Sequence, residues 1–418
     1  MRTICSNSTR TLVRPVVLAL TGAALGGAVQ GCRHEPQGQG GPYGAIVAQA
    51  VPAVEKAVGL RFKTPPRIEM RTKAQVRSFI LAQLDDPNAR RDIIGTQKAY
   101  SLLGMIPDTL NLRKLEEDLL NEQIVGYYDP KTKVLYVVAG VDKDVVNTVV
   151  THELVHALQD QYVNLDSVQK SIGDNDRLAA AQAVFEGQAV YSQMEATLGS
   201  GNMAVELPGG WDRIRDAIRN NRAAMPVYSS APLVIQETLI FPYLSGAEFV
   251  KNYKVKNPTG TIYNDMPVST EQILHQYAYF ATPRDMPTQV SFAAPGVKPT
   301  YDNDLGEFET RLFLYQHLNN QEDATRGAAG WDGDRYVVFD TPSGWAIAWA
   351  TVWDTQGDAA DFYAMMQRIR DSGKSATRAT AVTTGEIGGR PVVLWVDVPA
   401  GGRTDAVNLA NVRIGASK

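Results

Sequence analysis

The sequence predicts an α+β fold with a small sheet, two central helices, further helical additions and a small α+β unit at the C-terminal end. Three observations support this. The β-rich runs at 123–128 and 133–138 flank an Asp-Pro turn, which predicts a hairpin. Apolar residues recur at helical spacing over 147–161, and an Ala-rich helical segment follows at 178–191. From residue 305 onward, expected strands and helices alternate.

The helix expected at 147–161 contains the motif H-E-x-x-H, formed by His152, Glu153 and His156. Residues four apart lie one above the other on a helix, so the two imidazoles point the same way. Two imidazoles at this spacing can occupy two corners of a zinc tetrahedron. Glu153 lies on the adjoining face, from which a carboxylate can take a proton from water at the metal. The alternative is an amphipathic helix with two incidental histidines.

A third ligand is expected on the second helix. Glu186 stands in the middle of an otherwise apolar segment, where an unpaired carboxylate is costly and a metal ion removes that cost. We therefore assign Glu186 as the third zinc ligand. The other acidic candidates lie on an expected loop or a solvated helix face: Asp166, Asp174, Asp176 and Glu195.

The motif at 152–156, followed by Glu-Gly-x-Ala at 186–189, resembles the gluzincin metallopeptidases, most closely compact bacterial peptidase-MA-like proteins. This resemblance implies a zincin-like core: a sheet with an edge strand, an active-site helix and a glutamate helix, in the order found here over residues 66–200. The metzincin pattern is excluded, because Gln159 and Tyr162 stand where it requires glycine and a third histidine. In such folds the edge strand receives the substrate backbone as an added strand, and a structural hairpin is the alternative.

Two features depart from the family pattern. Glu186 follows His156 by thirty residues, a longer separation than in thermolysin, so the intervening polar loop at 162–177 is expanded. Phe185 occupies the place where aminopeptidases commonly carry asparagine, so the partner that orients the histidines must come from elsewhere. Asp160, one turn beyond His156, is the candidate for that role.

Gluzincins often use a later histidine or tyrosine to hydrogen-bond the oxyanion of the tetrahedral intermediate. The resemblance therefore makes His275 a candidate catalytic residue, with Tyr277 and Tyr279 as alternatives. A histidine with a purely structural role is the competing interpretation. His275 ends a short helix that Ser269 is expected to cap, with Gln272 completing a capping box.

The sequence divides into a metallopeptidase-like domain at 45–300, with a helical second half, and a C-terminal α+β domain at 301–418. Helices are expected at 45–62, 73–84, 89–103, 111–122, 210–222, 231–253, 306–318 and 357–371. Further strands are expected at 66–71, 336–340, 345–353, 380–386 and 390–397, with a turn at 330–335.

Residues 1–31 are typical of a secretory signal peptide, with a basic start and an apolar segment too short to span a bilayer. The segment ends in Val-Gln-Gly-Cys, which resembles a bacterial lipoprotein processing site and makes Cys32 the lipid attachment point. Gln30 departs from the small residue usual there, so ordinary secretory cleavage near Gly31 stays open. Cys32 is the one cysteine left after cleavage, and residues 32–44 form a flexible Gly/Gln/Pro-rich tether.

These features predict a zinc-dependent peptidase, exported and lipid-anchored in the cell envelope, that acts on peptides or proteins. Its zinc ion is expected to bind His152, His156 and Glu186, with Glu153 as the proton acceptor. No G-x-M-E-N-type element is present, which favours an endopeptidase. The alternative is a lipid-anchored envelope binding protein with a vestigial or structural zinc site. The net charge of −4 gives no reason to expect nucleic acid as a partner.

Overall fold

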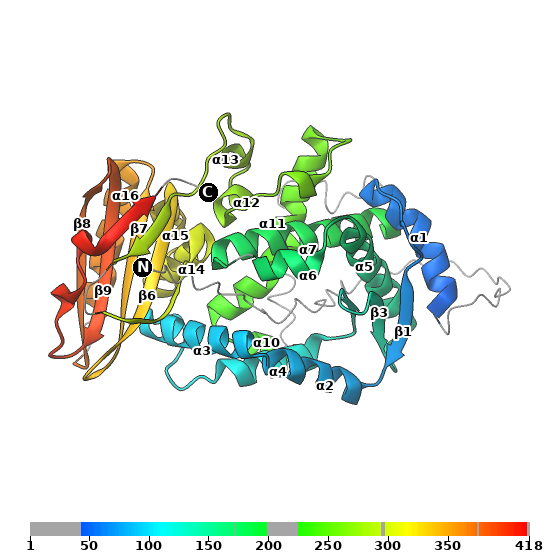
Figure 1. Ribbon diagram of the computed structural model, residues 1–418, viewed down its shortest axis with the longest axis horizontal. Coiled ribbons are helices and arrows are strands. Elements are labelled where there is room, and N and C mark those ends of the chain that lie inside the picture. Colours follow the sequence, from blue (N-terminus) through cyan, green and yellow to red (C-terminus); the bar gives the residue numbers. More distant parts are fainter. Residues whose placement is uncertain (1–42, 172, 199–224, 294–296, 374–375, 416–418) are drawn as a thin grey trace, which may run out of the picture.

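The computed structural model describes residues 43–171, 173–198, 225–293, 297–373 and 376–415 (Figure 1). The expected signal peptide, most of the tether and the helix expected at 210–222 lie outside these ranges. Among the described helices, none combines the length and the apolar composition that crossing a membrane requires. The described chain is a mixed α+β structure, as the sequence predicts.

The first sheet has three strands in the order β1-β3-β2. β1 (Arg67–Arg71) runs parallel to β3 (Val134–Val138), and β2 (Gly126–Asp129) runs antiparallel to β3. The predicted hairpin is therefore confirmed, and β2 is an edge strand. The next helix, α5 (Lys143–Tyr162), packs against β2 so closely that a Cβ at Gly126 would collide with Val149.

The helical half surrounds α5. Its longest members are α7 (Asn175–Leu198) and α11 (Leu233–Lys256), and α1 (Gly44–Val58) packs against α5 and α7 at the right of Figure 1. Helices α7 and α11 touch through their backbones, because a Cβ at Gly187 would collide with Gly246. Besides α6, which is described below, the described part of this half also contains α2 (Lys73–Leu84), α3 (Pro87–Leu102), α4 (Leu112–Gln123), α10 (Pro226–Ser230), α12 (Thr270–Leu274), α13 (Gln276–Phe280) and the 3-10 turn η2 (Ile262–Asn264).

The stretch expected to be a polar loop at 162–177 instead contains the helix α6 (Leu165–Ser171), so that prediction is wrong there. Asn164 caps the helix by accepting a hydrogen bond from the Ser167 backbone N–H. Leu165 is buried and packs with Phe185 of α7, so tertiary contact compensates for the polar composition.

Ser269 caps α12, as the sequence predicts, by accepting a hydrogen bond from the Gln272 N–H at 3.2 Å. The other half of the expected capping box differs, because the Gln272 side chain accepts from the Val268 N–H instead. The cap still fixes where α12 starts.

The C-terminal sheet has five antiparallel strands in the order β5-β6-β7-β9-β8. They are β5 (Pro299–Asn303), β6 (Trp331–Thr341), β7 (Gly344–Trp353), β9 (Arg390–Pro399) and β8 (Arg378–Ile387). The turn expected at 330–335 is wrong, because β6 already begins at Trp331 and pairs with β7 around a bulge before Gly333. The alternation expected from residue 305 is otherwise confirmed.

Both faces of this sheet are covered. Helices α14 (Gly306–Leu318), α15 (Gln321–Ala328) and α16 (Gln356–Ser372) lie on one face (Figure 1). Alternate residues point to opposite faces, so Trp349 packs with Phe362 of α16 while Ala348 joins a separate apolar cluster. That cluster includes the two-stranded sheet of β4 (Gln289–Phe292) and β10 (Val412–Gly415), flanked by the 3-10 turns η3 (Thr404–Ala406) and η4 (Leu409–Asn411).

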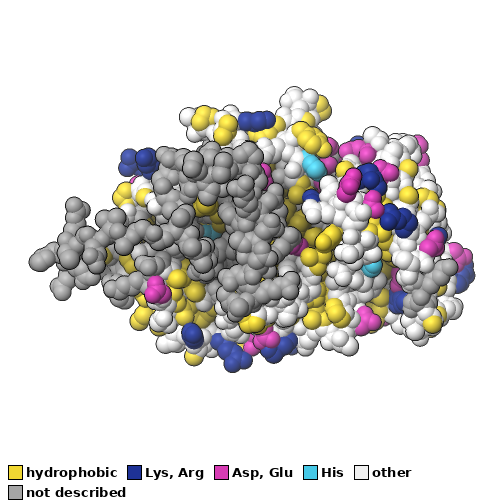
Figure 2. Space-filling model, turned by 180° about the vertical axis from the view of Figure 1, so that it is seen from behind, with side chains coloured by type: hydrophobic (Ala, Val, Ile, Leu, Met, Phe, Trp, Pro, Cys, Tyr) yellow, Lys and Arg dark blue, Asp and Glu magenta, His cyan; other side chains and the backbone are white. Residues whose placement is uncertain are grey.

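The main hydrophobic core runs through both halves of the molecule, from α2–α4 past α7 and α11 to α14–α16. Side chains on α3 reach the C-terminal part directly, since the Tyr100 hydroxyl donates to Glu309 Oε2 at 2.7 Å. Figure 2 shows the face opposite to that of Figure 1, where acidic and basic side chains are interspersed over the C-terminal part.

Candidate metal centre

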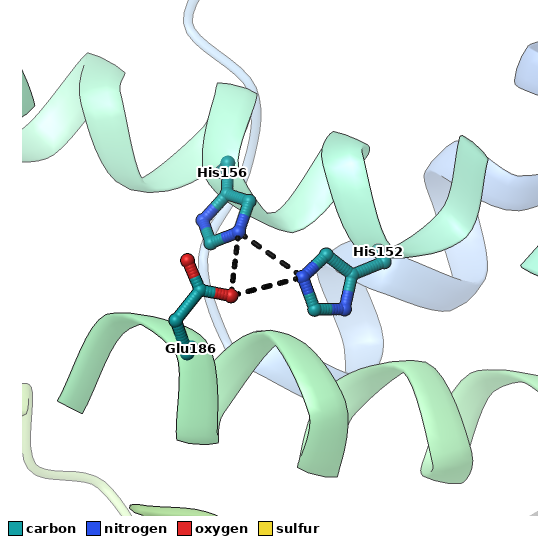
Figure 3. A group of neighbouring side chains, drawn as sticks. All are labelled: His152, His156 and Glu186. Carbon is teal, nitrogen blue, oxygen red and sulfur yellow. Dashed lines mark hydrogen bonds and ion pairs between the residues drawn. The ribbon is translucent and has the colours of Figure 1, made fainter. Parts of the chain in front are cut away.

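His152 and His156 on α5 converge with Glu186 on the neighbouring helix α7 (Figure 3). The Nε2 atoms of the two imidazoles are 3.1 Å apart. Glu186 Oε2 lies 3.2 Å from His152 Nε2 and 3.3 Å from His156 Nε2. A tetrahedral zinc ion with bonds of 2.0–2.1 Å separates its ligand atoms by about 3.3 Å. The two Nε2 atoms and Glu186 Oε2, which belong to the three residues predicted from the sequence, therefore have the spacing of three corners of a zinc tetrahedron.

The three side chains are buried, with exposed fractions of 2% for His152, 8% for His156 and 4% for Glu186. Burial alone would lower the pKa of His156, but the adjacent Glu186 carboxylate outweighs it and raises this pKa to about 9. Burial would likewise raise the pKa of Glu186, but the imidazoles beside it lower it to about 2. The two imidazoles thus stabilise the negative charge of Glu186, and a metal cation bound at the same place would do the same.

Glu153 lies beside this triangle and is only 2% exposed. Its Oε2 accepts a hydrogen bond of 2.6 Å from the backbone N–H of Tyr128 on the edge strand β2. Its Oε1 is buried and has no hydrogen-bond partner within the described part of the chain. Burial raises the pKa of Glu153 against the attraction of both imidazoles. A buried carboxylate oxygen without a donor is costly, and a water molecule on a bound cation would supply the missing partner.

Gln159 orients His156, a role that the sequence interpretation gave to Asp160. The Nδ1 atom of His156 is 2.8 Å from Gln159 Oε1. The Gln159 amide in turn donates to the backbone carbonyl of Phe185 at 2.9 Å and to Gln188 Oε1 at 3.0 Å. Because Gln159 follows His156 by three residues, helical spacing alone could have identified it. Its bonds to α7 join the two helices that carry the candidate ligands.

Asp160 has different partners. Its Oδ2 accepts hydrogen bonds from the Tyr128 hydroxyl at 2.7 Å and from Lys133 Nζ at 2.6 Å. Both donors belong to the β2–β3 hairpin, so Asp160 fastens the hairpin to α5. Tyr128 therefore contacts α5 twice, through its side chain at Asp160 and through its backbone at Glu153.

The sequence interpretation missed the aromatic neighbour of His152. The ring of Tyr243 on α11 stacks with this imidazole at a centroid distance of 6.2 Å and an angle of 28°. Tyr243 is buried, and the close contact between Gly187 and Gly246 holds α11 against α7. The contact between His152 and Tyr243 could not be predicted from sequence periodicity, because it depends on how α11 packs near α5 in the folded chain.

His275 lies in a different part of the structure from the three expected ligands. Its Nε2 is 2.7 Å from Glu307 Oε1 on α14, and its ring lies against Tyr277, which is exposed. Helix α12, which immediately precedes His275, contacts α7 at Asp176. The Oδ1 atom of Asp176 accepts a hydrogen bond of 2.9 Å from the Thr270 N–H. Ten helical residues from Asp176 to Glu186 span about 15 Å. The hydrogen bond to Glu307 therefore supports the structural interpretation of His275.

The other candidates also have separate neighbours. The Tyr279 hydroxyl donates to the Asp265 carbonyl. Among the acidic alternatives to Glu186, Asp174 forms an ion pair with Arg335 and Glu195 forms one with Lys254. Asp166 lies in the first turn of α6. Glu186 is the acidic residue that the described structure groups with the two histidines.

Comparison with protein families finds one match, a model described as a domain of unknown function (DUF8575), over residues 296–412. These residues include all five strands of the C-terminal sheet and helices α14–α16. The matched segment does not contain His152, His156 or Glu186. Searches of curated proteins and of solved structures return no match to this chain. The C-terminal part of the chain is thus similar to a domain family whose function is not established.

Proposed function

We propose that this protein is a zinc-dependent peptidase with a zincin-like core. The observation that carries the proposal is the spacing of 3.1–3.3 Å between the Nε2 atoms of His152 and His156 and Glu186 Oε2. Each of the three ligands is supplied by one of two adjacent helices. Three protein ligands leave a fourth zinc position open, which is typical of catalytic rather than structural sites.

The proposed chemistry uses the neighbours of the ligands. When bound, zinc lowers the pKa of water to about 7 and polarises a substrate carbonyl. Glu153 accepts the proton of the attacking water at Oε1, the oxygen that has no partner within the described residues, and then transfers it to the leaving amine. The Tyr128 N–H holds Oε2 and so fixes the direction in which Oε1 points.

The position of β2 supports a peptide as the substrate. This edge strand lies next to Glu153, which accepts the hydrogen bond of the Tyr128 N–H. All four β2 residues are buried, so a peptide would have to pair with main-chain groups of β2 other than the Tyr128 N–H. An extended peptide that pairs with a strand edge is held by main-chain hydrogen bonds, independently of its side chains. In this position its carbonyl groups would lie next to the proton acceptor.

The variant Glu153→Gln tests this proposal. Glu153→Gln is expected to keep one zinc ion per chain but to lose hydrolysis of casein or a peptide library by about 10²–10⁴-fold, because the proton acceptor is gone. Glu69→Gln, at an exposed position on β1, is the matched control and should retain full activity. Full hydrolysis by Glu153→Gln would refute the mechanism. Zinc binding without any chelator-sensitive hydrolysis in the wild type would favour the structural zinc site of a binding protein.

We further propose that the enzyme is exported and anchored by lipid on Cys32. The signal-like sequence at 1–31 and the single cysteine that follows it support this proposal. Several acyl chains at Cys32 would give stable membrane attachment. Cys32→Ser should shift the protein from the membrane fraction to the soluble fraction of the producing cells. Unchanged membrane attachment of this variant would refute the anchor.

A further inference from the structure

A second group of acidic side chains lies where the helical half meets the C-terminal sheet. Glu271 comes from α12, Asp285 from the segment between α13 and β4, and Asp354 from the residue after β7. One carboxylate oxygen of each lies within 4.8 Å of the others. Three segments that are far apart in the sequence thus bring their carboxylates to one point.

Glu271 is the buried member of this group, with 3% of its surface exposed. No residue in the described ranges donates a hydrogen bond to its side chain or forms an ion pair with it. The carboxylates of Glu307, Asp285, Asp354 and Asp176 lie close enough to act on it electrostatically. Burying a carboxylate without a partner is costly, so the arrangement of the neighbours calls for a positive charge.

Two nearby cationic side chains, Arg390 and His275, have partners outside this group. Arg390 acts on Asp354 from a distance but forms its ion pair with Asp332. His275 bonds to Glu307 Oε1, while Glu307 Oε2 is itself buried without a hydrogen-bond partner among the described residues. Negative charge is therefore concentrated around Glu271, and no side-chain cation of the described residues forms an ion pair with it.

We propose that Glu271, Asp285 and Asp354 bind a calcium ion. Calcium takes six to eight oxygen ligands at 2.3–2.6 Å, so two ligands of one ion lie at most about 5 Å apart, and the observed group fits within that limit. Asp354 is exposed and Asp285 is half-buried, which leaves room for water as the remaining ligands. Magnesium binds at 2.0–2.1 Å with strict octahedral geometry, and zinc prefers nitrogen and sulfur ligands.

The bound ion ties α12 to the end of β7, and thereby the helical half to the C-terminal sheet. This inference does not depend on the proposed peptidase activity, because its residues are separate from His152, His156 and Glu186. Calcium binding can therefore be measured in the Glu153→Gln variant as well as in the wild type.

The test uses the full chain, freed of divalent ions and reloaded with one equivalent of zinc, and titrated with calcium chloride by calorimetry. We expect one calcium ion per chain and a higher midpoint of thermal unfolding with calcium than without it. Asp354→Asn should weaken calcium binding at least tenfold. Asp361→Asn, which makes the same charge change at an exposed position on α16, should leave calcium binding unchanged.

Three results would overturn the calcium site. One is the absence of binding at about 10 mM calcium, well above the dissociation constants of weak extracellular sites. Another is an equal calcium affinity in Asp354→Asn and Asp361→Asn. The third is magnesium binding as tight as calcium binding, which would exclude the assignment of this ion. None of these results bears on zinc binding or on hydrolysis, so failure here is distinct from failure of the proposed enzyme.

Discussion

The proposed zinc site and the proposed calcium site both contain a buried glutamate, yet the charges that surround the two glutamates have opposite signs. Glu186 faces two imidazoles, and its pKa falls to about 2. Glu271 faces four carboxylates, and its pKa rises to about 10. Burial raises the pKa in both cases, so the neighbours decide the outcome. The charges at the proposed zinc site balance one another before any metal binds, whereas Glu271 has no ion-pair partner within the described chain.

The two sites also differ in how the chain assembles them. Two neighbouring helices supply the proposed zinc ligands, and Gln159 links those helices through its hydrogen bonds to Phe185 and Gln188. The acidic group draws on α12, a connecting segment and the end of β7. The first site is therefore preorganised by local helix packing, while the second depends on the docking of one half of the molecule on the other.

The largest expected difference between the sites concerns zinc. Glu186→Gln replaces the one carboxylate among the three proposed zinc ligands. Zinc affinity should therefore fall by more than the roughly 10–100-fold that is typical when a residue that only orients a ligand is removed. Glu271→Gln should leave zinc affinity unchanged, since this residue belongs to the other site. Competition with a chromogenic chelator measures both affinities. Equal losses in the two variants would show that the sites are not separate.

A smaller effect is expected from Gln159→Leu, which leaves the three ligands in place but removes the hydrogen bond to His156 Nδ1. Zinc affinity should fall by about 10–100-fold, because the imidazole loses its orienting partner. Gln161→Leu on the same helix, where the amide bonds to Lys63 and Thr64, is the control and should bind zinc normally. Unaltered zinc affinity in Gln159→Leu would mean that α5 alone orients His156.

The smallest effects are expected in protein stripped of divalent ions. Glu186→Gln should lower the free energy of unfolding by about 1.5–3 kcal/mol, because it removes a charged partner of two buried imidazoles. Glu271→Gln should change this free energy by less than about 0.5 kcal/mol, since its carboxylate has no favourable partner to lose. Urea unfolding of both variants tests this difference. A large loss in Glu271→Gln would contradict the description of Glu271 as uncompensated.

The same contrast explains what could be predicted from the sequence. His152, Glu153 and His156 were identifiable because helical spacing alone sets their relation, and Glu186 because a carboxylate in an apolar helix needs a partner. The hairpin and most helices were predicted to within a few residues. The acidic group was not predictable, because Glu271, Asp285 and Asp354 form no motif and meet only in the folded chain.

The start of β6 shows the same limit. Its residues Asp332, Gly333 and Asp334 have the composition of a turn. In the folded protein Asp334 is buried and accepts hydrogen bonds from the indole N–H groups of Trp331 and Trp349. The two indole donors, of which Trp349 lies on the neighbouring strand β7, allow Asp334 to be buried within β6. No local pattern in the sequence carries that information.

Helix α7 runs past both sites, with Asp176 near one end bonded to the α12 segment and Glu186 further along. The helix is rigid, so it sets a spacing of about 15 Å between these two attachment points. Binuclear hydrolases hold their two ions about 3.5–4 Å apart so that both contact the reacting oxygens. If both proposed ions bind, they would therefore lie too far apart to share a reacting oxygen, and the hydrolysis proposed at His152 and His156 would use the zinc ion alone.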